Sequence, residues 1–319
     1  MTANPAGATP LEAMRRILVI KLGALGDFVL AMGPFAAIRR AHPRAHIVLL
    51  TTAPFAELAR ASGYFDEVWL DDRPPLFAPA RWLALRRRLR GGGFDRVYDL
   101  QTADRTGWYF RLMGPGRRPE WSGHVKRCSH PHDDPARVHM HTVDRHAAQL
   151  AIAGISAVPA PDLTWMEAET RGYGLAPRFV LLVPGGAPHR PRKRWPAARF
   201  GALAGRIEAM GLQPVVIGGA AERDAAREIL DECAAAADLV GRTTFAEIAA
   251  LARQAAGAVG NDTGPMHLIA AAGCPAVVLF SSESDPALTA PRGAGVTVLQ
   301  RDDLAALGVV EVAEALRLR

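Results

Sequence analysis

Residues 17–27 read Ile-Leu-Val-Ile-Lys-Leu-Gly-Ala-Leu-Gly-Asp. They show a strand followed by a turn and the start of a helix, an order that recurs along the whole chain. The run Ile17–Lys21 is short, apolar and rich in β-branched residues, which is typical of a buried strand. Gly23 and Gly26 follow it and allow the backbone to turn tightly. Asp27 then stands at or near the start of a helix. A strand, a glycine turn and a helix in this order predict the opening unit of a parallel sheet.

The same alternation of apolar runs and alanine-rich helical segments continues to the end of the chain. In the first half we expect strands at 17–21, 46–50, 67–70 and 96–100, and helices near 27–41, 53–61, 79–90 and 103–112. In the second half we expect strands at 179–183, 214–217, 258–260, 276–280 and 296–299, and helices near 197–210, 221–235, 244–255, 265–272 and 302–317. The Pro-rich stretch 158–162 is the best linker candidate. The pattern predicts an α/β protein with two doubly wound parallel-sheet domains, residues 1–160 and 161–319, the final helix being free to pack back on the first.

Length and composition exclude several classes of protein. The chain has 319 residues, of which 49% are hydrophobic and 22% charged, so it is neither disordered nor collagen-like. No apolar run approaches the roughly 18 residues of a membrane span, and the opening residues show no secretory signal. The three cysteines, Cys128, Cys233 and Cys274, are too widely spaced to indicate a disulfide framework or a zinc knuckle. We therefore expect a cytoplasmic protein.

The net charge of +6 is unevenly distributed. Residues 1–160 hold 22 Lys and Arg against 14 Asp and Glu, whereas residues 161–319 hold 16 against 18. This asymmetry favours an anionic partner for the first half: a phosphorylated glycolipid, a membrane surface or a nucleic acid. The segment 77–90 combines five arginines with Trp82 and several leucines, and could rest on an anionic bilayer. We expect it instead to be a sheet-covering helix with a basic outer face.

Six of the ten histidines lie between Met113 and His146, where the strand and helix pattern lapses. They are His124, His130, His132, His139, His141 and His146. Their spacing matches no zinc template. We therefore expect no metal site here, but a long surface loop of the kind that often acts as a lid or binds substrate.

Two interpretations of Asp27 follow from its position. Aspartate is among the best residues for a helix N-cap, which would make its role structural. A dinucleotide-binding turn is the functional alternative, but the turn has the spacing G-x-x-G rather than G-x-G-x-x-G. The second strand also ends in Thr51-Thr52, without the acidic residue that would bind a ribose. A dehydrogenase is therefore disfavoured.

Residues 261–267 read Asn-Asp-Thr-Gly-Pro-Met-His and follow another predicted strand. Asp262 or Thr263 can cap the next helix, and the proline suits its first turn. The free backbone N–H groups around Gly264 and the positive end of the helix dipole together suit a phosphate. His267 lies one turn further along. A well-capped core helix would not by itself explain Asp262, Gly264 and His267 gathered at one strand end.

Two more loops stand at strand ends. The loop 183–196 places four cations before Trp195-Pro196, which favours an anion clamp over a solvated charge run. These cations are Arg190, Arg192, Lys193 and Arg194. The turn 218–222 ends in Glu222, which could accept hydrogen bonds from ribose hydroxyls or simply favour the start of a helix.

Taken together, the four motifs resemble glycosyltransferase family 9, the ADP-heptose:lipopolysaccharide heptosyltransferases. The resemblance runs from about Ile17 to Phe280, with the motifs in family order. Pro34 lies seven residues after Asp27 where six is usual, and the stretch between Gly186 and Lys193 departs from the common pattern. The resemblance implies a GT-B fold of two Rossmann-like domains facing a cleft. It also implies inverting, metal-independent transfer of a heptose from ADP-heptose to the inner core of lipopolysaccharide, with the ADP-sugar as a substrate and no cofactor.

The resemblance also implies a role for single residues. It assigns the catalytic base to Asp27, with Gly23 and Gly26 in the acceptor-side loop, and the phosphate-binding lysine to Lys193. It assigns donor binding to Glu222, Asp262, Thr263, Gly264 and His267. These roles are chemically consistent, because an ammonium group and a helix start can meet the charge that develops on a departing diphosphate.

The implied partners are a nucleotide-sugar donor and an anionic glycolipid acceptor, with peripheral contact at the cytoplasmic face of the inner membrane and no nucleic acid. The basic first half agrees with an acceptor rich in carboxylates and phosphates. Three alternatives stay open: a transferase using another nucleotide-sugar, a sugar epimerase of the same fold, and a nonenzymatic basic protein that binds nucleic acid or membrane.

Overall fold

The computed structural model describes residues 10–114, 116, 118–186 and 190–319, and these form two compact units. One unit holds the described residues up to Ala24 and those of Ala31–Ala160. The other holds Leu25–Leu30 and the described residues from Pro161 to Arg319. The segment Leu25–Leu30 is the short helix α1, and it belongs to the second unit because it packs on a helix of that unit, α10.

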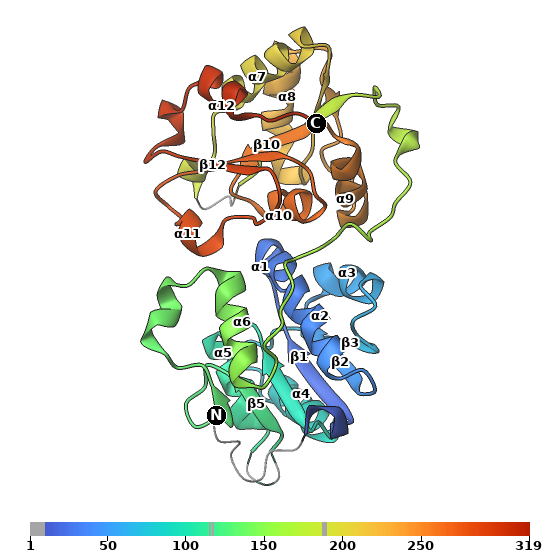
Figure 1. The fold of residues 1–319 in the computed structure, drawn as a ribbon, viewed down its shortest axis with the longest axis vertical. Coiled ribbons are helices and arrows are strands. Elements are labelled where there is room, and N and C mark those ends of the chain that lie inside the picture. The colour runs from blue at the N-terminus through green and yellow to red at the C-terminus, as the bar shows by residue number, and fades with distance from the viewer. Residues whose placement is uncertain (1–9, 115, 117, 187–189) are drawn as a thin grey trace. The chain divides into compact units, whose positions relative to one another are not determined.

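The first unit is built on a six-stranded parallel sheet (Figure 1). Its order is β3-β2-β1-β4-β5-β6, and its strands are β1 (Arg16–Ile20), β2 (His46–Thr51), β3 (Glu67–Leu70), β4 (Arg96–Asp99), β5 (Glu120–Gly123) and β6 (His130–Pro131). Its helices are α2 (Met32–Ala41), α3 (Ala56–Ala61), α4 (Pro79–Gly91), α5 (Asp104–Leu112) and α6 (Thr142–Ile152). Two pairs of helices pack together, α2 with α6 and α4 with α5. Leu18, Ile20, Val48 and Leu50 alternate along β1 and β2 and enter the core beneath α4 and α5.

The second unit repeats this plan with the strand order β12-β11-β10-β7-β8-β9, again all parallel. Its strands are β7 (Phe179–Val183), β8 (Gln213–Val216), β9 (Ala237–Asp238), β10 (Gly257–Asn261), β11 (Ala276–Phe280) and β12 (Val296–Gln300). Its helices are α1, α7 (Ala197–Ala209), α8 (Arg223–Glu232), α9 (Phe245–Gln254), α10 (Gly264–Ala271), α11 (Pro286–Thr289) and α12 (Val309–Ala315). In each sheet the first strand of the unit lies beside the fourth, which is the doubly wound order that the sequence predicts.

Both units have their own hydrophobic core. In the second, α7 packs against α8 and α12, and Val312 and Leu316 near the C-terminus belong to its core, so the final helix packs within its own unit. Every residue of β7 and of β11 is buried, which explains why these strands read as continuous apolar runs. Short 3₁₀ helices lie at Leu11–Ala13, Ala53–Phe55, Pro135–His139, Arg171–Tyr173, Pro191–Lys193, Ala220–Glu222 and Leu304–Ala306.

The predicted continuous helix 27–41 is wrong, because α1 ends at Leu30 and α2 begins at Met32. Pro34 gives the physical reason. It has no backbone N–H and could not bond the carbonyl of Leu30 in an uninterrupted helix, whereas in the first turn of α2 no such bond is required.

The predicted long loop between Met113 and His146 is also wrong in part. The structure places strands β5 and β6 there, and α6 begins at Thr142. β5 has the sequence Glu-Trp-Ser-Gly, which lacks β-branched residues, and it is a strand because it pairs with β4. His141 caps α6, since its Nδ1 accepts the N–H of Val143 at 3.2 Å. The helix expected at 302–317 is shorter than predicted, because α12 spans only Val309–Ala315. The strand β9 and the helix α11 were not predicted from the sequence.

Candidate functional site

Most of the predicted donor-binding residues line one cavity of the second unit. Its volume is about 330 Å³. The lining residues follow β7, β8 and β10: Val183, Gly185, Gly186, Gly218, Gly219, Glu222, Asp262, Thr263, Gly264 and Pro265. β7 and β10 are neighbours from which the chain winds in opposite directions, and ligands of doubly wound folds bind at the carboxyl ends of such strands.

Asn261, the last residue of β10, ties three segments of this site together. Its side chain is fully buried. Its Nδ2 donates to the carbonyls of Pro184 and Gly185 at 2.8 and 3.0 Å, and its Oδ1 accepts the N–H of Trp195 at 3.0 Å. The loop after β7 is thus bound at both ends to the last residue of β10, which directly precedes Asp262. Sequence analysis quoted Asn261 within its motif but assigned it no role.

Lys193 and Asp262 form an ion pair beside the cavity. Lys193 Nζ lies 2.5 Å from Asp262 Oδ2, and the two side chains are 12% and 10% exposed. Ser284 also donates to Asp262 Oδ2, at 2.7 Å, and was missed because no motif surrounds it. Trp195, fully buried next to this loop, donates its indole N–H to the carbonyl of Leu307. The ammonium group is therefore held at the cavity by a rigid frame.

The other cations of this loop do not form one clamp. Arg194 donates to the carbonyl of Gly186 at 2.7 Å and Arg190 to that of Glu283 at 3.4 Å, so both arginines bind the backbone of loops. Arg192 is exposed. The residues before Arg190 that sequence analysis noted as unlike the family, 187–189, lie outside the described residues.

The N-terminus of α10 lines the cavity with Thr263, Gly264 and Pro265. Pro265 has no backbone N–H and that of Met266 donates to the carbonyl of Thr263 at 3.1 Å, which leaves the N–H of Gly264 for a ligand. Thr263 occupies the N-cap position, but its side chain makes no capping hydrogen bond. Its hydroxyl oxygen is buried and has no hydrogen-bond partner among the described residues. A buried hydroxyl without a partner is costly, so this group is available to a ligand in the cavity.

Glu222 reaches the cavity over two glycines. Its Oε2 accepts the N–H of Gly219 at 2.8 Å, which makes it part of a local capping interaction. A Cβ atom at Gly185 or Gly218 would lie 3.1 or 2.9 Å from the side chain of Glu222. The glycines therefore leave the space that this carboxylate occupies. Both interpretations made from the sequence, helix start and ligand contact, are compatible with this geometry.

Asp27 is the third residue of α1 and not its N-cap. It is partly exposed, and no hydrogen bond or ion pair of its side chain occurs among the described residues. Gly26 beside it contacts the ring of His267, because a Cβ there would lie 2.8 Å from that ring. His267 is buried, on α10. Gly23 has a φ of +114°, and its missing side chain makes room for Phe55 in the first unit.

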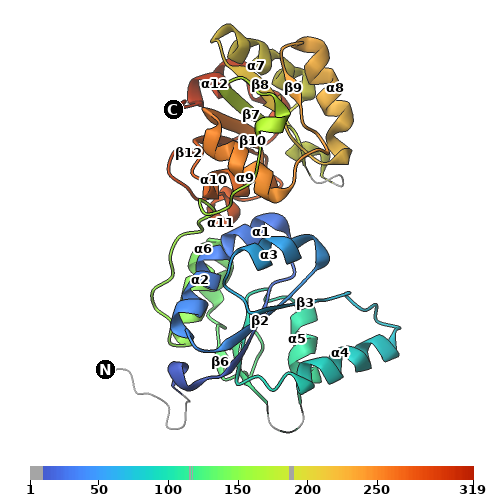
Figure 2. The same ribbon diagram turned by 90° about the vertical axis from the view of Figure 1, so that its right-hand side faces the viewer.

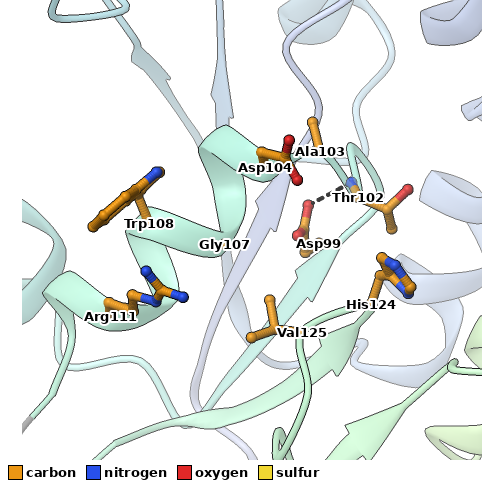
Figure 3. Close-up of a pocket in the computed structure, with 9 residues that line it drawn as sticks. All are labelled: Asp99, Thr102, Ala103, Asp104, Gly107, Trp108, Arg111, His124 and Val125. Atoms are coloured by element: carbon orange, nitrogen blue, oxygen red, sulfur yellow. Dashed lines mark hydrogen bonds between the residues drawn. The ribbon is translucent and has the colours of Figure 1, made fainter. Parts of the chain in front are cut away.

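A second polar cavity, of about 380 Å³, lies in the first unit (Figure 3). It is lined by Asp99, Thr102, Ala103, Asp104, Gly107, Trp108, Arg111, His124 and Val125, which follow β4 and β5. Burial raises the pKa of Asp99 to about 6, opposed by hydrogen bonds from backbone N–H groups and by the charge of Lys21. The guanidinium of Arg111 lies over the ring of Trp108, 4.7 Å from its centroid. Sequence analysis missed this cavity, because its residues share no motif.

The clustered histidines have different surroundings. His132, His141 and His146 are buried, and a ring nitrogen of His146 lies 3.2 Å from the carbonyl of Leu100. Burial holds the pKa of His146 well below its ordinary value of 6.5, so it stays neutral. Within the described residues no group of three or more His, Cys, Asp or Glu is placed to hold a metal ion.

Comparison with known proteins identifies relatives of this chain. The family model "Glycosyltransferase family 9 (heptosyltransferase)" matches residues 82–311. Lipopolysaccharide heptosyltransferase 2 of Salmonella typhimurium is 34% identical over 304 residues, which is 86% of this chain and 85% of the relative. A solved family 9 glycosyltransferase from Veillonella parvula is similar in fold, with a TM-score of 0.81, 20% identity and 97% of each chain covered. The E. coli ADP-heptose lps heptosyltransferase II gives a TM-score of 0.76, at 22% identity over 94% of this chain and 97% of that one.

Proposed function

The chain belongs to glycosyltransferase family 9, the heptosyltransferases, and we propose that it moves a heptose from ADP-heptose to the inner core of lipopolysaccharide by inversion and without a metal ion. It is a glycosyltransferase of the α/β GT-B class. The family disfavours a nonenzymatic basic protein. The observation that carries the proposal is the cavity of the second unit, where an ammonium group, a helix N-terminus and glycine loops converge.

The first requirement of this mechanism is stabilisation of the leaving group. A nucleoside diphosphate departs with negative charge that must be stabilised as it develops. The N–H of Gly264 at the start of α10, the Thr263 hydroxyl and the Lys193 ammonium are the donors that we assign to this task. Gly185, Gly186, Gly218 and Gly219 allow the backbone to approach the phosphates closely.

We assign the remaining contacts with the nucleotide-sugar mainly to two carboxylates. We assign the oxygen atoms of Glu222 to the ribose hydroxyls, since they accept hydrogen bonds at the wall of the cavity. Asp262 forms an ion pair with the Lys193 ammonium. We assign it to orient the sugar for attack at its anomeric carbon. His267 lies one turn into α10 and keeps its sequence-based assignment to the donor.

Asp27 is the proposed general base. An inverting transfer needs one group that removes the proton of the acceptor hydroxyl as the sugar is attacked from the face opposite the leaving group. Asp27 is partly exposed and is not used as a helix cap, which leaves its carboxylate available for that proton.

The acceptor is proposed to be an anionic glycolipid whose polar part binds the first unit. The cavity of Figure 3 offers Arg111 and His124 for carboxylates or phosphates, and the ring of Trp108 for the apolar face of a sugar. We further propose that the protein acts at the cytoplasmic face of the inner membrane and binds no nucleic acid. No helix in the described residues is long and apolar enough to cross a membrane.

A thermal-shift panel with ADP, UDP, GDP and their sugars tests the donor assignment. ADP should raise the melting temperature of the wild type most, in the presence of EDTA as well as without it. The Lys193→Ala variant should bind ADP about tenfold or more weakly, because a charge-assisted hydrogen bond is lost. Arg190→Ala, which removes a cation of the same loop that binds a backbone carbonyl, is the matched control.

Two results would overturn the assignment. Equal, small effects of Lys193→Ala and Arg190→Ala would show that the ammonium group is not part of the diphosphate site. A larger shift with UDP or GDP than with ADP would favour a transferase or an epimerase for another nucleotide-sugar.

A further inference from the structure

An apolar patch of the first unit lies at the edge of its core: Trp82 and Leu112 pack against the core, whereas three neighbouring apolar side chains are exposed. Leu76, Trp82, Trp108 and Leu112 line a hollow of about 320 Å³, and Phe77 follows Leu76 in the chain. We call these five residues the apolar face. Phe77 is 89% exposed, Leu76 77% and Trp108 50%. Large apolar side chains gathered in this way on a protein surface usually mark a site of interaction.

The backbone holds Leu76 and Phe77 outside the core. The segment between β3 and α4 projects from the first unit, and α4 returns beside α5 (Figure 2). The indole N–H of Trp82 donates to the carbonyl of Pro75 at 2.9 Å, which fixes the projecting segment to α4. Leu89 is the one buried residue of α4. Trp82 and Leu85 pack against the same core, so α4 covers the sheet and turns most of its arginines outward, as the sequence predicts.

The helices that carry Trp82, Trp108 and Leu112 are rich in arginine. Arg81, Arg86, Arg87, Arg88 and Arg90 stand on α4, whose thirteen residues include no acidic side chain. On α5, Arg105 lies over the ring of Trp82 at 5.8 Å from its centroid, and Arg111 over that of Trp108. The surface combines aliphatic side chains, indole rings and guanidinium groups, so its partner must offer hydrocarbon and anions together.

A bilayer with anionic headgroups offers this combination. Leucine and phenylalanine side chains can enter the hydrocarbon, indole rings prefer the interface, and guanidinium groups bind phosphates. A nucleic acid would stack on the aromatic rings, but it would leave the exposed Leu76 without an apolar partner. The chemistry of the face therefore favours lipid over nucleic acid.

We propose that the apolar face, with the arginines of α4, docks on an anionic phospholipid bilayer. Trp108 supports this assignment, because the same residue also lines the polar cavity of Figure 3. Docking through this face brings the polar cavity to the lipid surface. The purpose of the docking rests on the proposed function, since a glycolipid acceptor is anchored in such a bilayer.

Sedimentation with vesicles tests the proposal on the full chain. The wild type should bind vesicles of phosphatidylcholine and phosphatidylglycerol in equal parts, should leave vesicles of phosphatidylcholine alone, and should bind less as salt increases. The double variant Leu76→Ser/Phe77→Ser should lose about tenfold or more in partitioning, because two large side chains no longer enter the bilayer. Arg87→Glu should weaken binding to the mixed vesicles.

Matched controls come from elsewhere on the surface. Val138→Ser and Met210→Ser change exposed apolar side chains outside the face, at 56% and 48% exposure, and Arg60→Glu reverses an exposed charge on α3. These variants should bind vesicles as the wild type does. Equal losses in test and control variants, equal binding to both kinds of vesicle, or retention by DNA in place of vesicles would overturn the proposal.

The ADP-dependent thermal shift separates this proposal from the proposed function. The face variants should keep the wild-type shift with ADP, because they lie outside the donor cavity. Loss of vesicle binding by the wild type with an intact ADP shift would overturn the docking alone. A wild type that binds vesicles but shows no ADP shift would support the docking and contradict the donor assignment.

Discussion

Single side chains of this protein can be separated into those that fold it and those that remain available for chemistry. Asn261 is of the first kind, since both ends of its amide are used inside the protein. Thr263 and Asp27 are of the second kind. The hydroxyl of Thr263 has no partner among the described residues, and the carboxylate of Asp27 makes no cap. This difference gives the substitutions at these positions different expected effects.

Asp27→Asn should abolish most of the turnover while leaving ADP binding and the melting temperature nearly unchanged. Removal of a general base usually costs two to four powers of ten in rate, or roughly 3 to 5 kcal/mol of barrier. Transfer kinetics, ADP titration and thermal unfolding of the same preparation check this. If the variant is largely unfolded but its folded fraction has full specific activity, the role of Asp27 is structural.

Asp99→Asn should change how stability depends on pH. Burial raises the pKa of Asp99 from its ordinary 3.8 to about 6, so between these values the folded protein binds more protons than the unfolded chain. The free energy of unfolding of the wild type therefore falls as pH rises through this window, by about 3 kcal/mol from this residue. Asparagine does not titrate, so the free energy of unfolding of the variant should not fall in this way. Its amide oxygen can still accept hydrogen bonds from the N–H groups of Gln101 and Thr102.

Denaturant unfolding at pH 4, 5, 6 and 7 measures the difference between the two proteins. The free energy of unfolding of the variant should increase relative to that of the wild type as pH rises. Asp104→Asn, a change of an exposed carboxylate in the same cavity, is the control. A constant difference between the Asp99 variant and the wild type across the series would contradict a titration at Asp99.

At the scale of elements, the packing of α1 on α10 depends on two glycines. A Cβ on Gly26 would lie 2.8 Å from the His267 ring, and one on Gly264 would lie 2.6 Å from Leu25. Each glycine thus leaves room for a side chain of the other helix. This contact places α1, which carries the proposed base, in the second unit together with the residues proposed to bind the donor.

Gly26→Ala should destabilise this contact by about 1 to 3 kcal/mol, because the new methyl group must displace a buried ring. Gly205→Ala is the matched control, since Gly205 lies within α7 and a Cβ there meets nothing within 4 Å. That substitution should stabilise the protein by about 0.5 to 1 kcal/mol. Denaturant unfolding checks both, and a Gly26→Ala variant as stable as Gly205→Ala would refute the crowding at this crossing.

At the scale of the whole molecule, the surplus of cations in residues 1–160 should act on the acceptor more than on the donor. Salt screens charges over about 10 Å at 0.1 M, so the KM for an anionic acceptor should rise with salt. The KM for the donor should change less, because its binding rests on close contacts in a cavity. Activity should survive EDTA throughout. Equal salt dependence of both KM values, or a loss with EDTA that Mg²⁺ restores, would contradict these expectations.

The sequence predicts the two sheets and the loops that line the cavity of the second unit. This was possible because buried parallel strands read as apolar runs, and because glycine, proline and capping residues mark where each strand turns into a helix. The candidate residues Lys193, Glu222 and those from Asp262 to Gly264 share one property: each lies in the segment that follows a strand. All such segments leave a parallel sheet at one edge.

Other features arise only from contacts between residues far apart in the chain. β5 is a strand because β4 pairs with it, and α1 joins the second unit because two glycines let it meet α10. The raised pKa of Asp99 and the partners of Asn261 depend on burial, which local sequence does not encode. The exposure of Leu76 and Phe77 has the same origin, since an apolar residue is buried or exposed according to what packs on it.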